Sequence, residues 1–283
     1  MNPTSPILHG AERSPLGQPV AYRDTYAPEL LFPIDRQLKR DELGIDGSRL
    51  PFVGADLWNA YELSWLNPRG KPVVALARFE VPATSPRLIE SKSLKLYLNA
   101  FNQSRFASAG EIATLIRTDL SAAAGAPVEL VLTPLSALPQ RAAAYPAGVC
   151  IDELDIDIDT YQPAPELLAT VAGGGEVEEI LYSHLLKSNC LVTGQPDWGM
   201  VGVRYRGAPI DRAGLLRYIV SFRQHNEFHE QCVERIYCDL LSRCRPAALL
   251  VWARYTRRGG LDINPWRAST AQMHPGDAME IRQ

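Results

Sequence analysis

The sequence predicts an α+β protein built from two similar modules in tandem. The same order of elements, a β-hairpin followed by two helices and a strand, can be followed twice along the chain at an offset of roughly 120 residues. Residues 134–175 separate the two halves and are rich in proline, alanine and glycine. With 283 residues, 46% of them hydrophobic, the chain can form the cores of two modest domains.

The first module is expected to begin with a hairpin and to continue with two helices and a strand. Two apolar, β-prone runs flank the turn sequence Asn-Pro-Arg-Gly at residues 67–70, which is typical of a hairpin. Apolar residues recur at helical spacing in the next two runs, and Ser108 is the expected N-cap of the second helix. The predicted strands are residues 57–65, 73–79 and 128–133, and the predicted helices are residues 90–101 and 110–123.

The second module repeats this order. A turn sequence at residues 194–197 lies between two β-prone runs, and two amphipathic helices and a strand follow. The predicted strands are residues 181–192, 201–205 and 248–255, and the predicted helices are residues 211–224 and 228–244. The halves share this pattern without similar sequences, so the repeat is one of structure.

The stretch between the modules is expected to be a connection. Within it, residues 154–159 alternate leucine or isoleucine with aspartate, which predicts one half-exposed strand. A calcium loop is less favoured, because the glycine and the twelfth-position glutamate of an EF-hand are missing. The expected divisions are an N-terminal arm (1–20), a first module (21–140), a connection (141–175), a second module (176–270) and a tail (271–283).

Charge and cysteine content exclude several classes of protein. A formal net charge of -3 disfavours a nucleic-acid-binding domain, and the longest apolar stretch, residues 247–253, is too short for a membrane span. The N-terminus shows no apolar segment of a secretory signal. Five cysteines without a CxxC pair argue against a disulfide scaffold or a zinc ribbon. These observations favour a cytoplasmic protein that contacts neither membrane nor nucleic acid directly.

The sequence contains no signature of a nucleotide-binding loop or a zinc enzyme. The GxGxxG, GxxxxGK[ST] and HExxH patterns are all absent. His225 and His229 are four residues apart and could share a helix face as metal ligands. A third ligand at a recognisable spacing is lacking, so no metal site is predicted.

Cys190 is the cysteine that most suggests chemistry. It ends the first strand of the second hairpin, seven residues before Asp197, so the returning chain can bring the thiol and the carboxylate together. With Lys187 nearby, these are the parts of a covalent nucleophile and a proton donor. Taken alone, however, a cysteine on a strand is more typically a small buried apolar residue, as the cysteines of the last helix are expected to be.

Three further motifs could bind an anion or a purine-like ring. Ser91 or Ser93 could cap the helix that starts at Glu90 while its lysines face a phosphate, although an ordinary solvated helix start is equally compatible. Glu230, at the start of another helix, could accept two N–H donors of a guanine-like ring. Residues 254–260 hold three arginines and a glycine pair, which suit phosphate groups as well as a solvated surface.

Four motifs occur together, in the order Glu-Ser-Lys-Ser-Leu-Lys-Leu-Tyr (90–97), Cys-Leu-Val-Thr-Gly-Gln-Pro-Asp (190–197), Phe-His-Glu (228–230) and Arg-Arg-Gly-Gly-Leu-Asp-Ile-Asn-Pro (257–265). In this combination the chain resembles the NADPH-dependent 7-cyano-7-deazaguanine reductases, the nitrile reductases of queuosine biosynthesis. The resemblance covers about residues 20 to 270, with no departure at the motif positions. The chain's length resembles that of the long, two-module form of the family.

The resemblance implies two tunnelling-fold modules, each an antiparallel sheet with two helices on one face. It also implies the four-electron reduction of a nitrile to a primary amine by two NADPH. Cys190 would attack the nitrile carbon to give a covalent thioimide, and Asp197 would protonate the nitrogen. The residues implied in substrate binding are Leu88, Ile89, Glu90, His229 and Glu230. Those implied in NADPH binding are Ser91, Lys92, Arg258 and Gly259.

The resemblance further implies a homodimer whose small-molecule substrate is 7-cyano-7-deazaguanine. Cys232, two residues from Glu230, could form a reversible disulfide with Cys190 that protects the nucleophile from over-oxidation. Two alternative functions stay open. One is another tunnelling-fold enzyme, of the cyclohydrolase type, acting on a purine- or pterin-like ring with zinc. The other is a non-enzymatic deazapurine-binding protein.

Overall fold

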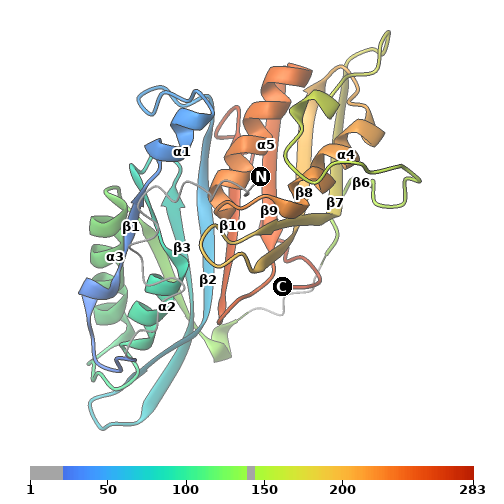
Figure 1. Ribbon diagram of the computed structural model, residues 1–283. Coiled ribbons are helices and arrows are strands. Elements are labelled where there is room, and N and C mark those ends of the chain that lie inside the picture. Colours follow the sequence, from blue (N-terminus) through green and yellow to red (C-terminus); the bar gives the residue numbers. More distant parts are fainter. Residues whose placement is uncertain (1–21, 139–143) are drawn as a thin grey trace. The chain divides into compact units, whose positions relative to one another are not determined.

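The chain forms two compact units, which Figure 1 shows in a computed structural model that describes residues 22–138 and 144–283. Within those residues, the first unit comprises residues 22–48, 55–138 and 257–263, and the second comprises the remainder. The N-terminal arm expected at residues 1–20 lies outside the described residues. The module boundaries expected from the sequence stay a prediction, since each unit also takes a short segment from a distant part of the chain.

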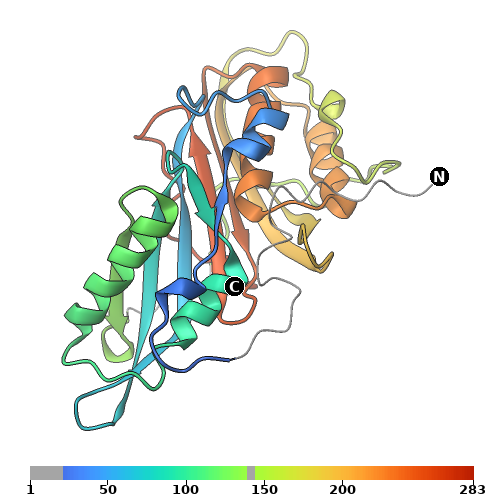
Figure 2. The same cartoon turned by 60° about the vertical axis from the view of Figure 1, so that its left-hand side comes forward.

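The first unit is an antiparallel sheet packed against helices. Its three main strands lie in the order β5-β3-β2, and a separate two-stranded sheet pairs β1 with β4. The strands are β1 (Pro33–Asp35), β2 (Val53–Leu66), β3 (Pro72–Pro82), β4 (Arg87–Ile89) and β5 (Glu129–Pro134). The helices are α1 (Gln37–Glu42), α2 (Ser91–Asn99) and α3 (Ala109–Ala124). In Figure 2, α3 lies in front of the strands of this unit.

Local sequence signals explain the hairpin and the long helix of this unit. The Asn67 side chain accepts hydrogen bonds from the backbone N–H groups of Arg69 and Lys71, each at 3.0 Å, and so closes the β2–β3 turn. Ser108 caps α3 as predicted, accepting from the Glu111 N–H at 3.2 Å. The helix ends at Gly125, whose φ of 74° is a left-handed conformation that glycine adopts without strain.

The cap of α2 corrects the sequence-based expectation. Glu90 is the N-cap, because its carboxylate accepts from the N–H groups of Lys92 at 2.6 Å and Ser93 at 2.8 Å. Ser93 instead donates its hydroxyl to the Glu90 carbonyl at 2.7 Å and accepts from the Phe32 N–H at 3.0 Å. The longer glutamate side chain reaches both donors at once, which neither serine hydroxyl could do.

The second unit has the same α+β composition. Its strands lie in the order β10-β9-β8-β7-β6, antiparallel except for the short β6, which pairs in parallel with β7. The strands are β6 (Val149–Cys150), β7 (Val177–Asn189), β8 (Pro196–Gly207), β9 (Ala248–Tyr255) and β10 (Leu261–Ala268), the last belonging to this unit from residue 264 onward. The helices are α4 (Arg212–Ser221) and α5 (His229–Cys244). α4 packs against β7 and α5 against β9, as Figure 1 shows.

Each unit includes one short segment from the other half of the sequence: residues 257–263 belong to the first unit and residues 49–54 to the second. Specific contacts hold each segment in place. In the first unit, the Gly260 carbonyl accepts from the Tyr61 N–H at 3.0 Å, and the buried Asp262 accepts from the Tyr61 hydroxyl at 2.5 Å. In the second unit, Phe52 packs edge-to-face on Tyr237, whose hydroxyl donates to the Pro51 carbonyl at 3.2 Å. These long-range contacts have no local sequence signal.

The predicted strand at residues 154–159 is wrong. These residues form no regular structure, although they alternate as a half-exposed strand would. β6 ends at Cys150, and the alternating segment pairs with none of the described strands. The predicted helix over residues 211–224 is also divided, since α4 ends at Ser221 and a 3-10 turn, Phe222–Gln224, follows.

The α+β class predicted from the sequence is confirmed, since each unit combines an antiparallel sheet with two main helices. Several short or late elements are additional to the prediction, namely β1, β4, α1, β6 and β10. Among the described residues, no helix has the length and apolar character needed to cross a membrane.

The core of the first unit supplies a test of this packing. Leu120, on the buried face of α3, is fully inaccessible to solvent, so Leu120→Ala should destabilise the protein by about 2–5 kcal/mol. Thr118→Ala, on the exposed face of the same helix, should cost less than about 0.5 kcal/mol. Urea unfolding followed by circular dichroism compares the two, and equal losses in both variants would contradict the assigned helix face.

Candidate active site

The β7–β8 hairpin positions the thiol and carboxylate singled out in the sequence. β7 ends at Asn189, earlier than predicted, so Cys190 lies in the turn and not on the strand. Its N–H donates to the Gln195 carbonyl at 2.8 Å, and its carbonyl accepts from the Gly194 N–H at 3.0 Å. Asp197 pairs with Ser188 in the strand register. Cys190 and Asp197 therefore lie at the same end of one hairpin, as the spacing predicts.

His229 joins this pair from a different element. It is the first residue of α5, and its Nε2 lies 3.8 Å from Oδ1 of Asp197. Its ring meets Tyr255 of β9 edge-to-face, with 4.0 Å between centroids. Asp197 and Cys190 are only 3% and 7% exposed, so the acid and the thiol are both largely shielded from water. Glu230, the next residue of α5, is also buried.

A second thiol lies deeper in the same unit. Cys232 is fully buried on α5, and burial, together with the charge of Glu227, raises the pKa of its thiol well above the ordinary value. Burial, then Cys232 and Asp197, likewise raises the pKa of Tyr255. Cys232 is therefore a neutral thiol at physiological pH. Cys190 and Cys232 are both free here, and the disulfide between them stays a prediction.

The loop before α5 is bonded to the residue before Cys190. The Asn189 N–H donates to the His225 carbonyl at 2.8 Å, and the Asn189 carbonyl accepts from the Glu227 N–H at 3.1 Å. The two asparagine side chains add a third bond, from Asn189 to Asn226, at 3.0 Å. This connection fixes the end of β7 against the start of α5, and so places Cys190 relative to His229.

Glu227 is the electrostatic anchor of that loop. Its buried carboxylate accepts from Arg235 Nη2 at 3.0 Å and from His225 Nε2 at 2.9 Å. Burial opposes ionisation, but the hydrogen bonds and charges of His225 and Arg235 outweigh it and lower the pKa of Glu227 to about 2. His225 precedes α5 and is used in this anchor, so it does not share a helix face with His229, an arrangement that the spacing allowed.

Lys187, three residues before Cys190, has a structural role. Lys187 Nζ donates to Asn189 Oδ1 at 2.5 Å and to the Arg223 carbonyl at 2.6 Å. Burial and the charge of Arg223 lower the pKa of this lysine, while Asp197 acts in the opposite direction. Lys187 thus reinforces the end of β7 next to the thiol.

The first unit carries the other residues named from the sequence. Leu88 and Ile89 are buried on β4, and Ile89 belongs to the core of this unit. Glu90 is fully buried as the cap of α2, and burial raises the pKa of its carboxyl, although the N–H groups of Lys92 and Ser93 oppose the rise. Ser91 and Lys92 follow in the first turn of α2, where the Glu90 carboxylate is itself the anion that the N–H groups of Lys92 and Ser93 bind.

A small surface depression of about 10 Å³ lies beside the glycine pair of the first unit. It is lined by Lys95, Glu62, Gly259 and neighbouring residues of β2 and α2. Lys95 Nζ contacts the Gly259 carbonyl and lies 3.1 Å from Glu62 Oε2. Gly259 and Gly260 have φ values of 59° and 78°, and a Cβ on Gly259 would meet the Lys95 side chain at 2.9 Å. The side chains of Lys95 and Glu62 therefore lie directly against the backbone of the glycine pair, and a Cβ at either glycine would displace them.

The arginine cluster of residues 254–260 is divided by the fold. Arg254 is buried in the second unit, where its guanidinium donates to the Gly276 carbonyl at 2.7 Å. Arg257 of the first unit lies over the ring of Tyr61, 4.5 Å from its centroid. Arg258 lies in the turn before β10, where its N–H donates to the Leu261 carbonyl at 2.9 Å. Arg254 consequently holds the C-terminal tail and is not part of a phosphate site.

Comparison with known proteins agrees with this arrangement of motifs. Residues 22–132 match the family described as "Nitrile reductase, 7-cyano-7-deazaguanine-reductase N-term", and residues 196–274 match that of "QueF-like protein". The NADPH-dependent 7-cyano-7-deazaguanine reductase of Azoarcus sp. is 71% identical over 283 residues, covering all of both chains. Proteins of the same name from Aromatoleum aromaticum and Dechloromonas aromatica are 65% identical over 283 residues and 64% identical over 280. They cover 100% and 99% of each chain.

The chain belongs to the NADPH-dependent 7-cyano-7-deazaguanine reductase family.

The residues that the family resemblance singled out fall into two sets, one in each unit. Cys190, Asp197, His229 and Glu230 are brought together in the second unit, while Leu88 to Lys92, with Arg258 and Gly259, lie in the first. Sequence reasoning did not find Asn189, Glu227 and Arg235, whose hydrogen bonds hold the chain next to Cys190. A polar run next to a motif is a weak signal, and only the fold shows which of its side chains are buried and paired.

The anchor at Glu227 predicts a pH-dependent loss of stability. Because its folded-state pKa lies below the ordinary value of 4.5, its stabilisation is complete above about pH 4.5 and is lost as the pH falls towards about 2. Glu227→Gln should therefore lower the free energy of unfolding at pH 7 by on the order of 3 kcal/mol and flatten its dependence between those pH values. Urea unfolding at a series of pH values measures both effects.

The matched control is Glu178→Gln, which removes an exposed carboxylate paired with Arg204 at 2.6 Å. This surface pair should change stability by less than about 1 kcal/mol at any pH. An acid profile of Glu227→Gln that overlays that of the unmodified protein would contradict the anchor.

Proposed function

We propose that this chain reduces the nitrile of 7-cyano-7-deazaguanine to a primary amine with NADPH. The proposal is supported by full-length relatives that carry the reductase name, among them one 71% identical. The observation that carries it is the shielded thiol of Cys190 in the turn of a hairpin that also presents Asp197, with His229 beside the acid. A cyclohydrolase or a non-enzymatic binding protein is less consistent with these relatives.

The proposed chemistry begins with addition of the thiol to the nitrile. The Cys190 sulfur forms a bond to the nitrile carbon, one π bond of the C≡N group breaks, and the nitrogen takes a proton from Asp197. The thiol proton passes to Asp197, so the product is a neutral covalent thioimide. The covalent step is needed because a thioimide accepts a hydride more readily than a nitrile does. NADPH supplies the two hydrides that the conversion to an amine requires.

The surroundings of the two groups suit this exchange of protons. Asp197 is buried, which removes competing water, and His229 Nε2 lies 3.8 Å from its Oδ1, close enough to interact electrostatically with the charge on the acid. The turn bonds of Cys190 hold its backbone, so the sulfur is positioned before substrate arrives. A hydride on carbon and a proton on nitrogen would give a thiohemiaminal, whose carbon–sulfur bond breaks. The thiolate would take a proton from the iminium nitrogen, and the remaining imine would accept the second hydride and a proton from solvent to become the amine.

The groups proposed to bind NADPH are Ser91, Lys92, Arg258 and Gly259. Lys92 and Arg258 carry the positive charge that suits an anionic nucleotide, and Ser91, in the first turn of α2, adds a hydroxyl. Lys95 is an additional candidate for NADPH binding, because it lines the depression beside Gly259 and contacts the Gly259 carbonyl. Lysine and arginine would recognise a 2′-phosphate, and so favour NADPH over NADH.

The other expectations are proposals of the same kind. We propose that Leu88, Ile89, Glu90, His229 and Glu230 bind the deazaguanine ring. We also propose a cytoplasmic homodimer of tandem tunnelling-fold modules, with boundaries at residues 21–140 and 176–270, that acts on the free base in queuosine biosynthesis. The net charge of -3 is consistent with an enzyme that does not bind tRNA directly.

The decisive experiment uses the nitrile substrate itself. Adding 7-cyano-7-deazaguanine to the protein with NADPH should oxidise two NADPH per molecule reduced, and without NADPH it should give the near-ultraviolet absorbance of a thioimide. Cys190→Ala should abolish the absorbance and lower turnover at least about 10³-fold, because the covalent step is lost. Asp197→Asn should lower turnover about 10²–10⁴-fold through loss of the acid.

Cys238→Ala is the control, because this thiol lies on α5 outside the hairpin and should leave both signals unchanged. An adduct that persists in Cys190→Ala would remove Cys190 from its role. No NADPH oxidation by the unmodified protein would contradict the proposed function as a whole.

The nucleotide site gives a separate prediction. Arg258→Ala should raise KM for NADPH at least about tenfold with little change in kcat, since a charged hydrogen bond contributes about 1.5–3 kcal/mol. The same variant should lose much of its preference for NADPH over NADH. Steady-state kinetics with both nucleotides measure this, and an unchanged preference would place the phosphate contact elsewhere.

A further inference from the structure

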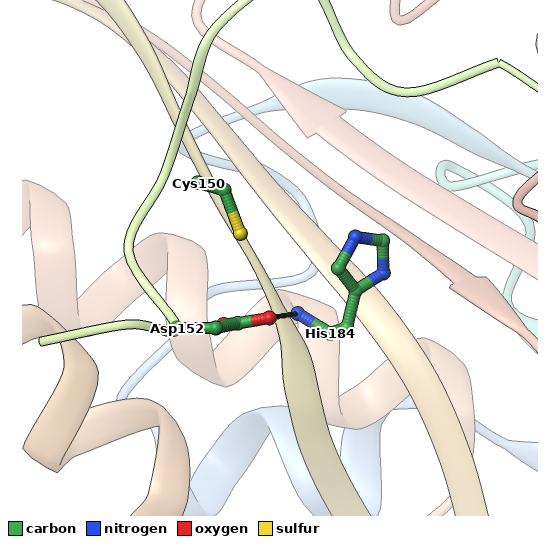
Figure 3. Close-up of side chains that lie close together, drawn as sticks. All are labelled: Cys150, Asp152 and His184. Atoms are coloured by element: carbon green, nitrogen blue, oxygen red, sulfur yellow. Dashed lines mark hydrogen bonds between the residues drawn. The ribbon is translucent and has the colours of Figure 1, made fainter.

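A group of chemically reactive side chains lies at the edge of the second unit, outside the proposed active site. Cys150, Asp152 and His184 each offer a ligand atom, and these atoms lie within 4.8 Å of one another. Figure 3 shows the thiol, the carboxylate and the imidazole gathered where β6 runs beside β7. It is the one group of three histidine, cysteine or acidic side chains so placed among the described residues.

The backbone brings these residues together by a short parallel pairing. Cys150 is opposite Tyr182 in the register of β6 and β7, and the Ile151 N–H extends that pairing by donating to the Tyr182 carbonyl at 3.0 Å. The pairing of β7 with β8 is irregular between Ser183 and Leu186. A bulge of this kind redirects side chains, and it places the His184 imidazole next to the cysteine of the adjacent strand.

Asp152 is held in place by the same bulge. Its Oδ1 accepts from the Ser183 hydroxyl at 2.6 Å, and its Oδ2 accepts from the His184 N–H at 3.0 Å, the bond drawn in Figure 3. Each carboxylate oxygen has a second lone pair, so these bonds orient the group without exhausting it. The acid is thus positioned beside the thiol before any ligand is present.

The histidine is oriented from the opposite side. Its Nδ1 donates to Oε1 of Glu280 at 2.9 Å, and Glu280 is itself buried and paired with Arg282 at 2.9 Å. The rings of Tyr145 and Tyr182 meet the imidazole edge-to-face, at 5.7 and 5.5 Å. In Figure 3 the other ring nitrogen, Nε2, is turned towards the side of the ring on which Cys150 lies.

We propose that Cys150, Asp152 and His184 form a Zn²⁺ site, with Glu280 as the hydrogen-bonding partner of the histidine ligand and water as the fourth ligand. A carboxylate that accepts from the far nitrogen of a metal-bound histidine is a recurrent feature of zinc sites, because it fixes the ring and its tautomer. A sulfur, an imidazole nitrogen and a carboxylate oxygen together favour zinc over magnesium or calcium, which take oxygen ligands.

The spacing is compatible with zinc after a small adjustment. Bond lengths of about 2.0–2.3 Å place the ligands of a tetrahedral zinc ion about 3.5 Å apart. The Cys150 side chain is exposed, so it can rotate to shorten its distances to the other two ligands. Exposure also leaves room for the water. The bound ion would link β6, the bulge of β7 and the C-terminal tail, and this proposal does not depend on the reaction proposed above.

The test uses Zn²⁺ and full-length protein that has been freed of metal with a chelator. Calorimetry should show one Zn²⁺ bound per chain, and the thermal unfolding midpoint should rise as zinc is added. Cys150→Ser and His184→Gln should each weaken binding at least about tenfold. Glu280→Gln should weaken it by about 10–100-fold, because it removes the partner of the histidine without removing a ligand.

Two variants serve as controls. Cys238→Ala removes a thiol on α5 and should leave zinc binding unchanged. Cys190→Ala removes the proposed nucleophile, whose neighbours Asp197 and His229 could also attract a cation, and should likewise leave binding unchanged. Zinc binding that survives both Cys150→Ser and His184→Gln, or that is lost in Cys190→Ala, would overturn the proposal.

A spectroscopic arm covers the case in which a ligand variant fails to fold. Cys190→Ala protein loaded with Co²⁺ in place of zinc should show a thiolate-to-cobalt charge-transfer band and the intense visible bands of a tetrahedral ion. A spectrum without the thiolate band would contradict ligation by Cys150. Failure of NADPH oxidation, by contrast, would leave the zinc measurements unaffected, so the two proposals can fail separately.

Discussion

The hydrogen bonds that join Asn189 to residues 225–227 are the interaction on which the candidate site depends. They connect the end of β7, one residue before Cys190, to the loop that starts α5, two residues before His229. Neither segment could fix this distance alone, because a hairpin turn and a helix N-terminus are both free to tilt. The buried ion pair of Glu227 with Arg235 then holds the loop against α5. Burial of these charges costs desolvation free energy, which is offset here because Glu227 bonds to both Arg235 and His225.

The sequence predicts well those parts of the fold whose cause is local. The β2–β3 turn follows from Asn67, and the start of α3 follows from Ser108, since each side chain bonds to backbone groups within four residues. Elements that need a distant partner were not predictable in this way. β4 pairs with β1 from a distant part of the chain, whereas residues 154–159 pair with none of the described strands. Alternation of apolar and polar residues permits a strand without supplying its neighbour.

In the candidate site, too, some features follow from local sequence and others depend on distant contacts. The closeness of Cys190 and Asp197 follows from hairpin spacing, because the returning strand must pass the outgoing one within a few residues. The addition of His229 to this pair depends on how α5 packs on the sheet, which no spacing in the sequence reveals. The pKa of Cys232 has the same origin: its thiol is held neutral by burial, and burial is a property of the assembled unit. The family resemblance named His229 and Glu230, whereas the supporting residues emerged only from the fold.

The C-terminal tail shows how far a segment outside the matched motifs can still belong to the structure. The family match of the second half ends at residue 274, yet the buried Arg254 donates to the carbonyls of Gly276 and Ala278, and Gln283 donates to Asn264 at 2.6 Å. Glu280 is buried by these contacts, and a buried carboxylate must find a donor, which His184 provides. The tail therefore does more than cover the sheet. Through Glu280 it fixes the orientation of His184, and so helps to bring a thiol, a carboxylate and an imidazole together at the edge of β7. None of these three residues belongs to the site that is proposed to reduce the nitrile.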